Sequence, residues 1–307
     1  MPGQTDLRLA RRHPQMRSIN RFGQAAGVMA CCLAASCARS PARSPAPYSP
    51  PRAPFRFVVY GDCRTGVDVH RKLVSGIVKA TPDLIFQTGD LVPIGTDTDA
   101  WKEYDQITAP LAAVAPIYPA RGNHDLGGPD YEARVTAPFT SGNKLYYSLD
   151  RAGCHFVILD NFSPLDPGSN QYVWLTHDLE NRAKKGTPTF VFFHEPPYSI
   201  GAHGSNMEVR QTLCPMFEKH HVSAVFCGHD HIYYRTTRSG VLYVVTGGGG
   251  APLYECDPKK GTIKGDKWES VHHFVICDVK GTSLRLTAIR EDGSLLDKLT
   301  LTLRPSV

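Results

Sequence analysis

A four-layer αββα sandwich of two mixed β-sheets, packed face to face and flanked by helices, is the fold predicted for this chain. Short apolar runs alternate with helical patterns from residue 55 onward, as in α/β proteins. Several of these runs stop abruptly at a carboxylate, amide or imidazole. Beyond the glycines at 247–250 the pattern becomes all-β, and we expect these last strands to complete the second sheet.

The first elements form a β-α-β unit. Residues 55–60 are strand-like and stop at Gly61-Asp62, and residues 84–86 are strand-like and stop at Gly89-Asp90. Between them, apolar residues at 73, 74, 77 and 78 share one helix face, and Thr81-Pro82 ends that helix. Each strand therefore has an aspartate at its carboxyl end, where open α/β sheets bind their ligands.

The same alternation continues along the chain. Asp99 is expected to cap a helix that runs toward residue 114, and residues 117–118 lead into Gly122-Asn123-His124-Asp125. The further elements that we predict are a hairpin at 145–149 and 154–159, helices near 172–179 and 209–217, strands at 190–193, 222–227 and 242–245, and C-terminal strands at 274–279, 284–289 and 295–303.

Charge and composition separate an N-terminal leader from the rest. Residues 1–53 hold eight Arg and one acid, which leaves 26 Lys+Arg against 28 Asp+Glu, so no nucleic-acid partner is expected for the near-neutral body. A short apolar stretch follows the basic segment, so we predict a signal peptide at 1–37, a Pro/Ala/Ser-rich linker at 38–54 and one domain at 55–307. The alternative is an amphipathic or disordered extension.

The leader ends in Leu33-Ala-Ala-Ser-Cys37, which resembles a bacterial lipoprotein processing site. We therefore expect export to the periplasm, to the outer membrane through a lipidated Cys37 tether, or to the extracellular space. The domain itself holds six further cysteines without C-x-x-C spacing, so a zinc knuckle is not expected. Cys154, Cys227 and Cys277 lie within apolar runs and are interpreted as buried thiols.

The polar residues that end the strands form one chemical set, made of Asp62, Asp90, Asn123, His124, Asp125, His194, His229 and His231. Carboxylate oxygen, amide oxygen and imidazole nitrogen are ligands that Mn, Fe and Zn accept. A carboxylate such as Asp90 can offer one oxygen to each of two neighbouring ions. The sequence therefore predicts a site for two divalent or trivalent metal ions.

Five motifs in order carry a family resemblance: Gly61-Asp62-x-Arg64, Gly89-Asp90, Gly122-Asn123-His124-Asp125, Val191-x-x-His194 and Gly228-His229-x-His231. Together they resemble the calcineurin-like metallophosphoesterase superfamily, whose metallo-dependent phosphatase fold is the sandwich predicted above. The run His231-x-Tyr233-x-Arg235 and the early Asn-His-Asp are most similar to purple acid phosphatases and their bacterial relatives.

This resemblance implies a role for each matched residue. One metal would be held by Asp62, Asp90 and His231, and the other by Asp90, Asn123, His194 and His229, with Asp90 as the bridge. The implied reaction is metal-dependent hydrolysis of a small phosphorylated substrate by a metal-bridging hydroxide. A monoester is favoured over a diester as the substrate. His124 would be the general acid, and Asp125 would hold its tautomer and orientation.

Two positions depart from the family pattern at the first metal, where Arg64 replaces a common His and Pro93 replaces a common Asp or Tyr. Arg64 is interpreted as a bidentate phosphate clamp, with a salt bridge to a neighbouring Asp as the alternative. Asn123 and His203 are further candidates for substrate contact, although His203 could equally be an exposed loop residue. Tyr233 and Arg235 either rim the site or pack beneath it.

Two other functions stay open at this stage. The first is a phosphodiesterase or nuclease of the same fold, although a nuclease would be expected to carry a basic groove. The second is a non-catalytic metal-binding surface protein with a single metal, which the changes at Arg64 and Pro93 suggest.

Overall fold

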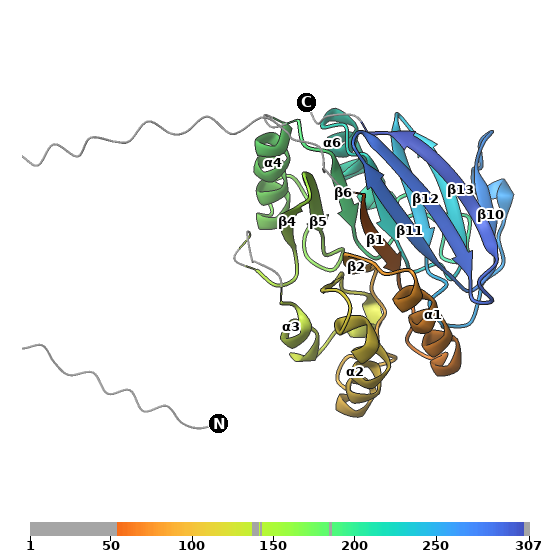
Figure 1. Ribbon diagram of the computed structural model, residues 1–307. Helices are drawn as coiled ribbons and strands as arrows, with labels where there is room; N and C mark the ends of the chain where they lie inside the picture. The colour runs from red at the N-terminus through yellow and green to blue at the C-terminus, as the bar shows by residue number, and fades with distance from the viewer. Residues whose placement is uncertain (1–53, 137–140, 142, 184–185, 304–307) are drawn as a thin grey trace, which may run out of the picture. The chain divides into compact units, whose positions relative to one another are not determined.

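The computed structural model describes residues 54–136, 141, 143–183 and 186–303 of the 307-residue chain. The domain predicted to begin at residue 55 lies almost entirely within these ranges. The predicted signal peptide with Cys37, and the linker up to residue 53, lie outside the described residues. Two β-sheets with helices on their outer sides make up the domain (Figure 1), as the predicted sandwich requires.

The first sheet has the strand order β13-β12-β11-β1-β2-β3. Its strands are β1 (Phe55–Tyr60), β2 (Leu84–Gln87), β3 (Ile117–Pro119), β11 (His273–Lys280), β12 (Ser283–Arg290) and β13 (Leu295–Thr302). Strands β1, β2 and β3 are parallel, whereas β11 joins the other edge of β1 in antiparallel register. The C-terminal strands therefore extend the first sheet, and our expectation that they complete the second sheet was wrong.

The second sheet has the order β10-β8-β9-β7-β6-β5-β4. Its strands are β4 (Tyr147–Arg151), β5 (Cys154–Ile158), β6 (Thr189–Phe192), β7 (Ala224–Cys227), β8 (Tyr233–Arg238), β9 (Val241–Thr246) and β10 (Lys267–Glu269). The predicted hairpin is present as the antiparallel pair β4–β5. Strands β5, β6, β7 and β9 are parallel, so their carboxyl ends meet at one edge of the sheet.

The helices lie outside the sheets (Figure 1). They are α1 (Val67–Lys79), α2 (Thr98–Ala112), α3 (Asp130–Arg134), α4 (Asn170–Ala183), α5 (Met207–Thr212) and α6 (Cys214–Lys219), with short 3-10 turns at Asn123–Asp125 and Pro258–Lys260. The cap of α2 is Asp97, which accepts hydrogen bonds from the backbone N–H groups of Asp99 and Ala100, so Asp99 is not the cap. The single helix expected at 209–217 is two helices, with Pro215 in the first turn of the second.

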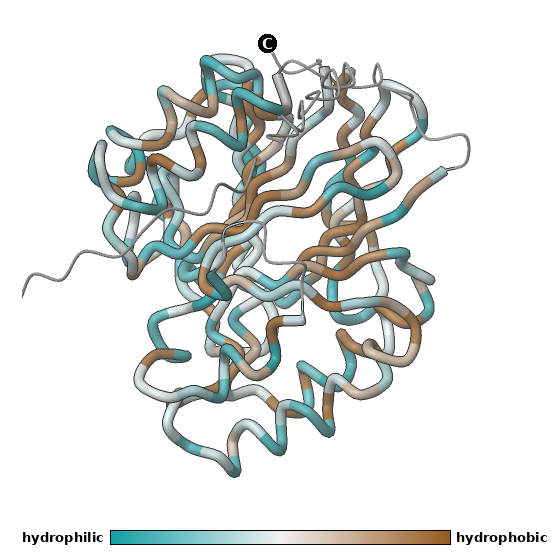
Figure 2. Tube along the Cα trace, turned by 90° about the vertical axis from the view of Figure 1, so that its left-hand side faces the viewer, coloured by the Kyte–Doolittle hydropathy of each residue, from teal (hydrophilic) through white to brown (hydrophobic). Residues whose placement is uncertain are grey.

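Strand β6 shows why the runs in the second sheet are apolar without alternation. Phe190 and Phe192 point into the core between the sheets, whereas Val191 and Phe193 pack on the other side with α4, α5 and α6. Phe86 stacks on Phe192 across the interface, with ring centroids 4.1 Å apart. Figure 2 shows the result, with hydrophobic strands at the centre and hydrophilic stretches along the outer helices.

The six cysteines of the described residues are unpaired, and Cys154, Cys227 and Cys277 are buried as expected. Within the described ranges, the helices are all too short or too polar to span a membrane.

Candidate metal centre

The predicted metal ligands converge from the carboxyl ends of five parallel strands. Asp62 follows β1, Asp90 follows β2, Asn123 follows β3, His194 follows β6, and His229 and His231 follow β7. Asp62, Asp90 and His229 have positive φ angles of 59°, 55° and 68°. Residues other than glycine adopt this left-handed region at an energetic cost, and such strain concentrates at functional sites. The strand ends are therefore bent to aim these side chains inward.

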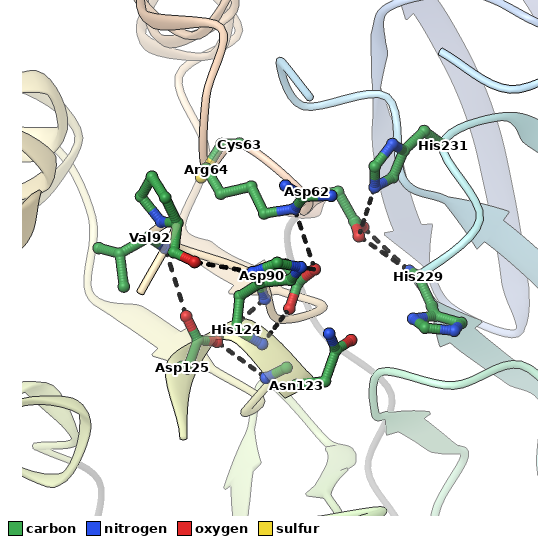
Figure 3. Close-up of polar contacts among 12 residues, drawn as sticks. Asp62, Cys63, Arg64, Asp90, Val92, Asn123, His124, Asp125, His229 and His231 are labelled. Atoms are coloured by element: carbon green, nitrogen blue, oxygen red, sulfur yellow. Dashed lines mark hydrogen bonds and ion pairs between the residues drawn. The ribbon is translucent and has the colours of Figure 1, made fainter. Parts of the chain in front are cut away.

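The ligand atoms fall into two groups that share Asp90. In the first group, one ligand atom each from Asp62, Asp90 and His231 lies within 4.8 Å of the others. In the second group, Nε2 of His194 lies 3.5 Å from Asp90 Oδ1, 3.0 Å from Asn123 Oδ1 and 3.1 Å from His229 Nδ1. Figure 3 shows Asp90 between Arg64 and His124, with His229 and His231 beside the Asp62 carboxylate. The predicted partition of the ligands is the one that these distances favour.

Backbone carbonyls hold the outer nitrogen of two ligand histidines. His194 Nδ1–H donates to the Thr88 carbonyl at 2.8 Å, and His231 Nδ1–H donates to the Pro252 carbonyl at 2.6 Å. Each bond fixes the tautomer whose Nε2 lone pair faces the cluster, which is the usual outer contact of a metal-binding histidine.

Burial makes the cluster unfavourable without a cation. It raises the pKa of Asp62 well above its usual value, and the neighbouring Asp90 carboxylate raises it further. It also lowers the pKa of His229 to about 3 and that of His231 to about 4. Both imidazoles are therefore neutral at pH 7 and can donate a lone pair. This set of oxygen and nitrogen donors fits divalent or trivalent cations.

Glycines allow the loops of the centre to pack tightly. A Cβ at Gly228 would lie 2.2 Å from Asp62 Oδ2, and a Cβ at Gly249 would lie 2.1 Å from the Gly61 carbonyl oxygen. The backbone N–H of Gly249 instead donates to that oxygen at 2.8 Å. The glycine run at 247–250 thus brings backbone against the Asp62 loop.

Asp125 does not contact the ring of His124. Its two oxygens accept four backbone N–H groups, from Asp90 at 2.9 Å, Leu91 at 2.8 Å, Val92 at 3.3 Å and Gly122 at 2.8 Å. His124 is held instead by the Pro93 carbonyl, 2.7 Å from its Nδ1. The predicted contact with His124 is therefore wrong, because Asp125 points down into the loop between β2 and α2. Burial raises its pKa to about 7 despite these bonds.

Arg64 lies beside an aspartate, as in the salt-bridge alternative to a phosphate clamp. Its Nε lies 3.3 Å from Asp90 Oδ2, and its side chain is 16% exposed. Its terminal amino groups make no hydrogen bond to another described residue, so they are available to a ligand of the cluster.

Two side chains line the mouth of the centre beside the ligand histidines. The ring centroid of the exposed His203 lies 4.2 Å from that of His229. The Tyr254 ring stacks on His231, with ring centroids 4.1 Å apart. The loop of His203 is held by Asp230, whose carboxylate accepts hydrogen bonds from the backbone N–H groups of His203 and Gly204 and from the Ser199 hydroxyl. His203 therefore lies beside a predicted metal ligand, and its contact with substrate stays a prediction.

Tyr233 and Arg235 pack beneath the site and do not line it. Both donate to Oδ2 of Asp297, the Tyr233 hydroxyl at 2.8 Å and Arg235 Nε at 2.6 Å. Because Asp297 belongs to β13 and the other two belong to β8, this buried contact links the two sheets.

Three residues of the site were missed from the sequence. Asn161 follows β5, and its Oδ1 accepts the backbone N–H groups of His194 and Glu195 at 2.9 and 2.8 Å. Its place at a strand end was a usable signal. Asp230 lies inside a recognised motif, between two ligands, but its hydrogen bonds to a distant loop are not visible in the sequence. Tyr254 lies in irregular structure and gave no signal.

Comparison with known proteins agrees with this geometry. The sequence model of the calcineurin-like phosphoesterase family matches residues 55–233. Purple acid phosphatase 21 of Arabidopsis thaliana is 31% identical over 220 residues, which cover 64% of this chain and 50% of the relative. Purple acid phosphatase 1 of Ipomoea batatas is 32% identical over 164 residues, covering 48% of this chain and 35% of the relative. The chain spans about half the length of its first curated relatives.

Solved structures share the fold. The purple acid phosphatase PPD1 of yellow lupin superposes with a TM-score of 0.72 at 20% identity, over 84% of this chain and 55% of that one. A dimetal phosphatase of Danio rerio superposes with a TM-score of 0.61 at 18% identity, over 81% of this chain and 99% of that one.

Proposed function

The chain belongs to the calcineurin-like phosphoesterase family, and we propose that it is an exported metal-dependent phosphatase that hydrolyses phosphate monoesters. The observation that carries the proposal is the gathering of six oxygen and nitrogen ligands from five strand ends into two groups that share Asp90. The preference for monoesters rests on the purple acid phosphatase relatives.

The side chains around the cluster supply distinct parts of the reaction. Metal ions held by these ligands would acidify a water molecule and offset the charge that builds on the phosphoryl oxygens. The Nε of Arg64 lies beside Asp90, and its terminal amino groups would hold two phosphoryl oxygens. His203, next to His229, and Asn123, next to His194, would contact the same group.

His124 is the general acid of the proposed reaction. Its Nδ1–H is bound to the Pro93 carbonyl, so the proton given to the leaving oxygen must come from Nε2. That nitrogen lies 3.9 Å from Asp90 Oδ2, and the side chain is 33% exposed. This exposure lets the oxygen of a leaving alcohol reach Nε2.

The test is hydrolysis of nitrophenyl phosphate and bis-nitrophenyl phosphate by the full chain, stripped with chelator and reloaded separately with Mn, Fe or Zn. We expect metal to restore hydrolysis, with the monoester cleaved faster than the diester. We expect Asp90→Ala to abolish both metal binding and turnover. Asp99→Ala is the matched control, because the side chain of Asp99 is 85% exposed. A preference for the diester would favour a phosphodiesterase, and folded protein without turnover would refute the proposal.

A further inference from the structure

Two segments next to His124 contain no charged residue. They are residues 91–96, Leu-Val-Pro-Ile-Gly-Thr, and residues 126–129, Leu-Gly-Gly-Pro, which we call the apolar rim. Leu91, Val92 and Gly95 of these segments are buried. Within the rim, Ile94 is 59% exposed and Leu126 is 37% exposed. Single exposed apolar residues are common on protein surfaces, so the meaning of this pair depends on where they lie.

Both residues adjoin the proposed acid. Ile94 follows Pro93, whose carbonyl holds the His124 ring at 2.7 Å, and Leu126 follows His124 by two residues. A general acid must approach the oxygen of the leaving group to within hydrogen-bond distance. Because the apolar rim adjoins His124, we expect the alcohol part of a bound ester to lie next to it.

The rim is fixed in place before any substrate arrives. The carbonyl of Gly95 accepts the indole N–H of buried Trp101 at 2.9 Å, and the Ile94 carbonyl accepts the backbone N–H of Asp97 at 3.0 Å. A Cβ at Gly95 would lie 2.3 Å from the Leu126 carbonyl oxygen, so the two segments are in close backbone contact. A preformed apolar surface binds its ligand with little ordering cost.

The rest of the mouth has the opposite character. His203 and Tyr254 present polar groups beside the ligand histidines His229 and His231, and Arg64 presents a cation beside Asp90. We propose that the apolar rim binds the alcohol part of the substrate, which makes this chain selective for phosphate monoesters of apolar alcohols. The proposal rests on the proposed function, because it takes His124 as the acid.

The experiment measures kcat/KM of the metal-loaded full chain for methyl, butyl and hexyl phosphate and for glycerol phosphate. We expect kcat/KM to rise about twofold for each methylene that the rim half covers, and glycerol phosphate to be poorer than butyl phosphate. Ile94→Ser and Leu126→Ser should each flatten the dependence on chain length. Val114→Ser is the matched control, since Val114 is 46% exposed and precedes β3, at the opposite end of that strand from the metal centre.

Binding of methyl and hexyl phosphonate, measured by calorimetry, gives a readout independent of turnover. Tighter binding of the hexyl compound, lost in Ile94→Ser but kept in Val114→Ser, supports the proposal. Equal kcat/KM across the alkyl series, or equal effects of all three substitutions, overturns it. Failure to cleave nitrophenyl phosphate with any metal would instead refute the proposed function, so the two failures are distinct.

Discussion

Replacing Asp125 by alanine should destabilise the protein strongly, even before any metal or substrate is considered. The carboxylate is 1% exposed and accepts four backbone N–H groups, three of them from Asp90, Leu91 and Val92. Each buried donor left without an acceptor costs about 1–3 kcal/mol, so the lower end of this range gives a loss of about 4 kcal/mol. For a domain of this size, that corresponds to a fall in Tm of roughly 10 °C.

The assay is urea unfolding of the metal-free full chain, with Asp105→Ala as the control. Asp105 is 51% exposed and pairs with Arg134, so its loss should cost less than about 1 kcal/mol. Should Asp125→Ala unfold like the wild type and yet lose turnover, Asp125 would act through His124 after all, and our account of the loop would be wrong.

Four further outcomes follow from the contacts. His124→Ala should keep its bound metal and lose about 10²–10⁴ in kcat on alkyl phosphates, a result that unchanged turnover would contradict. Asp230→Ala should free the loop of His203 above the metal ligands. We expect KM to rise several-fold, a larger change than the loss of metal content, which elemental analysis measures. Asp297→Ala should cost about 3–5 kcal/mol in urea unfolding, because it leaves Arg235 buried without its partner, and a loss below 1 kcal/mol would refute this. Burial lowers the pKa of His70 from 6.5 to about 3. As the pH falls, the unfolded state therefore takes up a proton at this residue before the folded state does. The free energy of unfolding should then decrease as the pH drops below 6.5. His70→Phe should reduce that fall in Tm, and an unchanged pH profile would count against it.

The positions of the metal ligands could be predicted because the signal is local. Each ligand directly follows an apolar run, and parallel strands bring their carboxyl ends to one edge of a sheet. Asp62, Asp90, Asn123, His194 and the histidines after β7 are therefore found together as expected.

The parts that could not be predicted depend on contacts between distant segments. The sequence alone does not show that β11 pairs with β1, or that Asp297 accepts from a strand more than 60 residues away. The family resemblance assigned Asp125 to His124, but the carboxylate of Asp125 accepts four backbone N–H groups instead. Backbone donors carry no sequence signature, so these hydrogen bonds are visible only in the structure.

A titration of the chelator-stripped chain with metal, followed by calorimetry and by nitrophenyl phosphate hydrolysis in the same samples, tests the two-metal phosphatase directly. We predict two ions bound per chain, with turnover that appears as the second ion binds. One tightly bound ion in folded protein without turnover would contradict the account and identify a metal-binding protein instead.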